Sequence, residues 1–213
     1  MKFSILCAFL ALAVASCGSV SVPRESYWRL DLAGRDQTKL GTSANAAATR
    51  VLRVQDLQLG NAMSGDFLVV SSGPSRLSTR ELDRWVAPLD RLATDALLLS
   101  LSRTGAFALV KAAGDGGAED LTLNGRILDF SEHRDDTGKR AAIAQFTFWL
   151  EGKDGLVFAD EFCGMTPIVG EGAAAAVQAL SIALQQVVNQ VMTRIALQSL
   201  GAAALEATPA TPR

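Results

Sequence analysis

The residues of this sequence that could perform chemistry are few and scattered. The single histidine, His133, lies in the charged segment SEHRDDTG, where Asp135 and Asp136 are adjacent carboxylates. Histidine is the side chain best suited to proton transfer near neutral pH, but a lone histidine in a charged hairpin is usually a solvated turn residue. The adjacent acids could form an acid pair, although such acids usually serve solubility. Cys163 lies in an apolar stretch, which favours a small buried side chain over a nucleophile. We therefore predict no catalytic residues and no enzymatic activity.

Motifs that bind metals or phosphates are also missing from the sequence. A zinc site needs several histidine and cysteine ligands at set spacings, whereas this chain has one histidine and three cysteines. The chain has no glycine-rich phosphate loop followed by lysine and no G-x-S-x-G turn. We predict no metal and no cofactor apart from a covalent lipid, for which the evidence lies at the N-terminus.

The N-terminus has the features of a secretory signal. A lysine is followed by an apolar run from Ile5 to Val14 and then by small residues. This run is about half the roughly 20 residues that a membrane-spanning helix needs. The residues up to Cys17 resemble the lipobox of bacterial lipoproteins, in which the chain is cut before a cysteine that carries diacylglyceryl and an acyl group such as palmitate. We predict a signal peptide at 1–16, cleavage between Ser16 and Cys17, and lipidation of Cys17. The alternative is an incidental cysteine near an ordinary cleavage site.

A lipid on Cys17 would determine where the protein resides. Two or more acyl chains hold a soluble domain stably on a bilayer. In lipoproteins of the enteric type, a glycine after the lipidated cysteine permits export to the outer membrane, so Gly18 predicts an outer-membrane protein that faces the periplasm. Residues 17–26 form a lipidated tether, in which eight residues span at most roughly 28 Å. Cys7 leaves with the signal, and Cys163 then remains as a free thiol that has no disulfide partner within the mature chain.

The charge balance and the length limit the partners and the number of domains. The chain has 20 basic and 22 acidic residues, and removal of the signal takes one lysine and no acid. This slightly acidic balance does not favour nucleic-acid binding. The mature length suits one domain of ordinary size. We predict one α+β domain at 27–200 and a disordered tail at 201–213.

Alternating apolar residues and turn signals predict several strands. The middle strand of the last three has Ala144, Phe146, Phe148 and Leu150 on one face and polar residues on the other, which is typical of a half-buried sheet. The last three strands are expected to form an antiparallel meander, and an insert at 33–49 is expected to form a loop. The predicted strands are 26–32, 51–59, 67–72, 107–111, 121–130, 141–152 and 156–165.

Two long helices are predicted. Ser78 and Glu81 fit a capping box before an apolar run that ends near Gly105. Pro88 interrupts this run, so the helix either kinks there or begins there. The second helix, 173–199, has an apolar stripe at spacings of three and four, which favours packing on the sheet over contact with a partner or a membrane. The stripe consists of Val177, Leu180, Leu184, Val187, Val191 and Ile195. The fold class is therefore α+β: a two-layer sandwich of a mixed, mostly antiparallel sheet with two main helices on one face.

These features together resemble the ABC-type transport auxiliary lipoproteins. The resemblance rests on the lipobox, the segments YWRLDL and RELDRWVAPLDRLATDALLLSLSRTGAFALV, and LNGRILDF before the C-terminal helix. Its most specific piece is Asp83-Arg84-Trp85 followed by Pro88-Leu89. Such proteins are similar to outer-membrane lipoproteins of paraquat-inducible and related lipid-transfer systems. The resemblance implies a two-layer fold and partnership with an ABC permease complex and an MCE-type periplasmic protein.

Two classes of function remain open at this stage. The first is a non-enzymatic module that docks a lipid transport apparatus at the outer membrane. The second is a stand-alone envelope lipoprotein that binds a small apolar ligand. Trp85 is either a core residue, the commoner role for tryptophan, or a partner contact. Assembly into a homo-oligomer is also compatible with either function.

Overall fold

The computed structural model describes residues 23–31, 49–60, 63, 65–73 and 75–206. The predicted signal peptide, the cleavage site at Ser16 and Cys17, and Gly18 lie outside the described residues, as do most of the insert at 33–49 and residues 207–213. No helix within the described ranges is long and apolar enough to cross a membrane.

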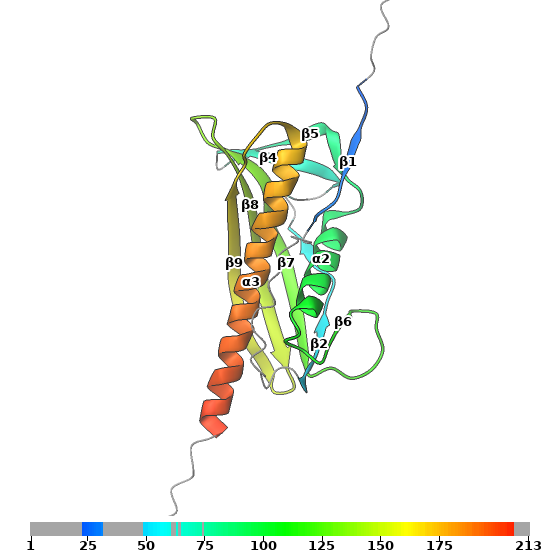
Figure 1. Cartoon of the computed structure of the whole chain (residues 1–213), viewed down its shortest axis with the longest axis vertical. Helices are drawn as coiled ribbons and strands as arrows, with labels where there is room; N and C mark the ends of the chain where they lie inside the picture. The colour runs from blue at the N-terminus through cyan, green and yellow to red at the C-terminus, as the bar shows by residue number, and fades with distance from the viewer. Residues whose placement is uncertain (1–22, 32–48, 61–62, 64, 74, 207–213) are drawn as a thin grey trace, which may run out of the picture.

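A mixed sheet is built around the long central strand β7, as Figure 1 shows. On one side, β7, β8 and β9 pair antiparallel as the predicted meander. On the other side, β2, β3 and β4 pair with successive parts of β7, each in parallel. β6 extends the sheet from β2, and β5 followed by β1 extends it from β4. The strands are β1 Ser26–Trp28, β2 Val51–Val54, β3 Gln58–Leu59, β4 Phe67–Ser72, β5 Arg76–Trp85, β6 Leu109–Ala112, β7 Leu121–Arg134, β8 Arg140–Gly152 and β9 Gly155–Pro167.

Both long helices lie on one face of this sheet, in front of it in Figure 1. α2, Leu89–Arg103, packs near β6, whereas α3, Gly172–Glu206, runs along β8 and β9. The two-layer α+β fold class is therefore confirmed. α3 continues to Glu206, past the predicted end of the domain at residue 200. We call the opposite face of the sheet, which no described helix covers, the helix-free face.

The segment at 76–85 is a strand, so the capping box predicted at Ser78 and Glu81 is wrong. β5 pairs antiparallel with β4 and parallel with β1, and these pairings outweigh the helix-favouring composition of the segment. The Ser78 hydroxyl donates a hydrogen bond across the hairpin to the Val70 carbonyl oxygen. Pro88 is the N-cap residue and α2 begins at Leu89, which confirms the alternative in which the helix starts at the proline.

The core between the layers joins the aromatic face of the meander to the apolar stripe of α3. Phe146 and Phe148 stack with ring centroids 5.6 Å apart, and Phe130 contacts Phe146 edge to face. Trp85 is 2% exposed and lies against Phe130, so it is a core residue rather than a surface for partners. All the predicted stripe positions of α3 are buried, so the stripe packs on the sheet.

α3 also closes the free edge of β9. A Cβ atom at Gly164 would overlap the carbonyl oxygen of Ala183, so only glycine permits this approach of helix and strand. The Gln186 side chain accepts a hydrogen bond from the Met165 amide at 3.0 Å, and the Gln190 side chain donates to a β9 carbonyl at 2.8 Å. Backbone groups that an edge strand would leave unpaired are thus satisfied by the helix.

Candidate functional site

The structure places Cys163 on the helix-free face with an exposed side chain, so the prediction of a buried filler is wrong. Phe162 and Gly164 are buried against α3, and the alternation of a strand turns the residue between them outward. Partial burial, together with the nearby Glu161 charge, raises the pKa of the Cys163 thiol. A raised thiol pKa reduces the fraction of reactive thiolate, so this position is poorly suited to nucleophilic chemistry.

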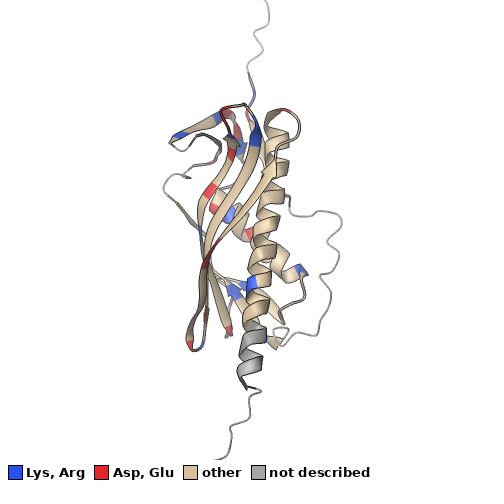
Figure 2. Ribbon diagram, turned by 90° about the vertical axis from the view of Figure 1, so that its left-hand side faces the viewer, with Lys and Arg blue, Asp and Glu red and all other residues tan. Residues whose placement is uncertain are grey.

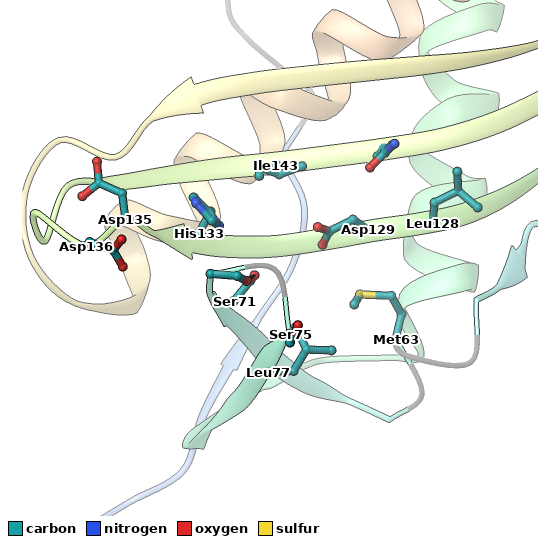
Figure 3. Close-up of a pocket in the computed structure, with 12 residues that line it drawn as sticks. Met63, Ser71, Ser75, Leu77, Leu128, Asp129, His133, Asp135, Asp136 and Ile143 are labelled. Atoms are coloured by element: carbon teal, nitrogen blue, oxygen red, sulfur yellow. Dashed lines mark hydrogen bonds between the residues drawn. The ribbon is translucent and has the colours of Figure 1, made fainter.

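An open pocket of about 680 Å³ lies on the helix-free face, where the β4–β5 and β7–β8 hairpins meet. Figure 3 shows Asp129 and His133 on β7, with Met63, Ser71 and Leu77 across from them. The pocket takes its three acids and its histidine from one stretch of the chain, 129–136, and places them opposite residues of the β4–β5 hairpin. The lining of the pocket includes Met63, Ser71, Leu77, Leu128, Asp129, His133, Asp135, Asp136 and Ile143.

A β-bulge in β7 determines the chemistry of this pocket. The pairing of β7 with β8 shifts between Ile127 and Asp129, while Ile127 and Phe130 are both buried in the core. The extra residue therefore places Leu128 beside Asp129 in the pocket wall, an apolar and an acidic group side by side. The sequence pattern contains no clear signal for the bulge, because LNGRILDF also fits a regular strand.

Asp129 is the most unusual ionisable group of the pocket. Burial raises the pKa of its carboxyl group, and the Ser131 hydroxyl and the His133 charge oppose that rise only in part. Its Oδ1 atom and the Ser131 hydroxyl are both buried without a well-formed hydrogen bond. An acceptor of this kind costs free energy until a donor reaches it.

The polar groups of the pocket do not form a hydrogen-bonded catalytic arrangement. Ser71 and His133 are register neighbours, but the Ser71 hydroxyl donates to the Gly73 carbonyl oxygen at 3.3 Å. The Asp135 carboxylate lies in the hairpin turn and accepts hydrogen bonds from the backbone amide and the hydroxyl of Thr137. These bonds lower the pKa of Asp135. Acyl transfer would need a hydroxyl that donates to a base. The arrangement as described suits recognition of a ligand.

Metal binding has no evident site in the described structure. No three His, Cys, Asp or Glu side chains come together there in a way that could hold a metal ion.

A buried ionic cluster lies on the helix-covered face of β7, on the other side of the sheet from the pocket. Glu132, whose side chain is 2% exposed, contacts Arg80 at 2.6 Å, Arg134 at 2.8 Å and Arg140 at 2.7 Å. Burial alone would raise the pKa of Glu132, but hydrogen bonds from Arg140 and Arg80 lower it to about 2. Arg140 also donates to the carbonyl oxygens of Gly170, just before α3, and of Gly172, its first residue. The cluster therefore ties β5, β7, β8 and the start of α3 together.

The fold thus defines an α+β domain with two hairpins around an open acidic pocket and a long helix along one sheet edge. The chain belongs to the family of ABC-type transport auxiliary lipoprotein components, whose family model matches residues 32–192. This membership assigns it an accessory role in transport and associates it with an ABC transport system of the cell envelope.

Comparison with solved structures supports the fold. Protein XCC0632 from Xanthomonas campestris superposes with a TM-score of 0.72 at 15% identity, over 84% of this chain and 99% of that chain. The crystal structure of an uncharacterized protein gives a TM-score of 0.61 at 20% identity, over 81% of this chain and 99% of that chain. At these identities the similarity shows the fold alone. No sequence among curated proteins matches this chain.

Proposed function

We propose that this protein is a non-enzymatic lipoprotein of an ABC/MCE-type intermembrane lipid transport system that docks the periplasmic apparatus at the outer membrane. Membership of the auxiliary lipoprotein family supports the accessory role. The observation that carries the docking role is that the two ends of the chain lie at opposite ends of the domain. The chain enters the fold at one end, and α3 leaves it at the other (Figure 1).

The N-terminal end is tied to the fold just before β1. Glu25 forms an ion pair with Arg84 at 3.0 Å, and Arg84 also pairs with Asp66. A lipid on Cys17 would be eight residues away from Glu25 along the chain, a distance of at most roughly 28 Å. This short reach would hold the end of the domain that carries β1 and the two hairpins close to the bilayer.

The opposite end would point into the periplasm. α3 extends beyond the end of the sheet there, as Figure 1 shows, and Leu197 on this helix is 59% exposed. Figure 2 shows few charged residues along the part of α3 that it colours. A weakly charged helix that projects from the domain is suited to contact an MCE-type protein or an ABC permease complex. Assembly into a homo-oligomer is compatible with the same role.

The second candidate function is that of a stand-alone envelope lipoprotein that binds a small apolar ligand. The pocket on the helix-free face favours this candidate, because its volume lies in the range of small-molecule sites, about 300–1,000 Å³. The two candidates differ in whether function depends on partner proteins.

Copurification tests the docking role. The protein extracted in mild detergent should bring with it an MCE-type protein, and Cys17→Ala should abolish fatty-acid labelling, membrane attachment and function. Gly18→Asp should move a folded domain to the inner membrane and abolish function in a host with enteric sorting rules.

Cys163→Ser, a cysteine variant that keeps the lipid site, serves as the control and should behave as the wild type. Full function from a protein held at the inner membrane, or purification without partners, would exclude docking.

A further inference from the structure

We infer that the pocket on the helix-free face binds a primary ammonium group that carries an apolar chain. The inference goes beyond the proposed docking role, and it rests on the acceptors, the apolar walls and the charge of the pocket.

The acceptor for the ammonium group is Asp129. Asp129 lines the pocket, and its buried Oδ1 atom makes no well-formed hydrogen bond, so the carboxylate is poorly satisfied and would gain from a donor that approaches it from the pocket. Asp136 lines the same pocket and is exposed at the hairpin, where it adds a second negative charge. The third acid, Asp135, already accepts hydrogen bonds from the backbone amide and the hydroxyl of Thr137.

The charge of the pocket favours a cation. His133 is the one basic side chain among the described residues that line it. The neighbouring Arg134 and Arg140 bind Glu132. No arginine or lysine of the described structure lines the pocket beside Asp129, and His133 is its one basic neighbour in the wall, so an ammonium group would add a charge-assisted hydrogen bond to this carboxylate. A carboxylate ligand would be repelled by the same acids.

The apolar part of the ligand has a surface directly beside the acid. Because of the β-bulge, Leu128 lies next to Asp129 in the sequence and in the wall. Ile143 of β8 and Leu77 of β5 complete this surface, and Leu77 is 49% exposed. A chain attached to the ammonium group would cover these side chains and remove apolar area from water. The volume of about 680 Å³ accommodates such a ligand.

Calorimetric titration with hexylamine tests the inference. The full chain is titrated in non-ionic detergent with hexylamine, hexanol, hexanoate and methylammonium, and protein-free micelles serve as the blank. Hexylamine should bind saturably and at least tenfold more tightly than the other three probes, because it alone has both the charge and the chain. Equal binding of hexanol would show that the acid plays no part. Equal binding of hexanoate or of methylammonium would also overturn the inference.

A pair of isosteric variants locates the binding. Asp129→Asn should weaken hexylamine binding at least tenfold and should not lower the melting temperature, because it removes a poorly satisfied buried carboxylate. Asp154→Asn, an exposed residue in the turn between β8 and β9 at the far end of the sheet, should bind like the wild type. Unchanged affinity in a folded Asp129→Asn protein would overturn the inference. Copurification of partners is a separate measurement, so a negative result here leaves the docking proposal intact.

Discussion

Replacement of Glu132 by glutamine would test how the ionic cluster stabilises the fold. The glutamine keeps the shape of the side chain but removes the negative charge that three arginines surround. Arg80 and Arg140 are 19% and 12% exposed, so their charges would stay largely buried. The ion pairs left to them would be the longer contacts to Asp83 at 3.9 Å and to Glu171 at 3.8 Å. Removing one partner of a buried ion pair typically costs about 3–5 kcal/mol. We expect the free energy of unfolding at pH 7 to fall by about 3 kcal/mol.

The pH dependence gives the same magnitude independently. The pKa of Glu132 is about 2 in the folded protein and 4.5 ordinarily, a difference that corresponds to about 3 kcal/mol. Because the folded-state pKa is the lower one, this stabilisation is present above pH 4.5 and is lost as the pH falls toward 2. Between pH 7 and pH 3, the stability difference between wild type and variant should shrink by about 2 kcal/mol.

Urea denaturation, followed by tryptophan fluorescence at both pH values, measures this difference. Glu151→Gln is the matched control, since Glu151 is exposed on β8 and its substitution should change stability by less than about 0.5 kcal/mol. A difference below about 1 kcal/mol for Glu132→Gln at pH 7 would refute the reasoning, as would a difference that does not change with pH.

Three further substitutions test the packing of α3 and β9. Gly164→Ala should lower the free energy of unfolding by about 1–3 kcal/mol, because the new methyl group would overlap the Ala183 carbonyl and separate helix and strand; an unchanged urea midpoint would contradict this close approach. Leu184→Asp should abolish the cooperative thermal transition seen by circular dichroism, because it buries a charge in the apolar stripe. The control Ile182→Asp, at a position 46% exposed on the same helix, should retain the transition, and equal behaviour of the two variants would be inconsistent with the packing. Cys163→Ser should change the melting temperature little because the side chain is exposed, and a large loss of stability would show that the thiol is packed.

The local periodicity of the sequence was enough to predict the two layers. Alternation along 141–152 identified the apolar face of β8, and spacings of three and four identified the buried stripe of α3. Such patterns are reliable where one face of a long element is buried, because a shift in its register would expose all of its apolar side chains to solvent. The N-terminal features likewise predict, from local sequence alone, the lipid site at Cys17 and the outer-membrane sorting signal at Gly18.

The composition of 76–85 predicted the wrong element. The segment is rich in residues that favour helices, yet it pairs with β4 and β1. Intrinsic propensities differ by less than about 1 kcal/mol per residue, so the backbone hydrogen bonds and contacts of two neighbouring strands outweigh them. The strands that pair with this segment, β1 and β4, are short, and β1 is distant in the sequence. No pattern within 76–85 identifies either of them.

The ionic cluster around Glu132 and the acidic pocket around Asp129 were both decided by the tertiary structure. Arg80 on β5 meets Glu132 on β7 only because β4 pairs with both strands and brings them onto the same sheet. Asp129 enters the pocket only because a bulge turns two consecutive residues outward. The sequence alone determined which residues are apolar, charged or turn-forming, and hence the period of each long element. Which charges become neighbours depends on strand pairing and register, because hydrogen bonds between distant segments form only when the whole sheet assembles.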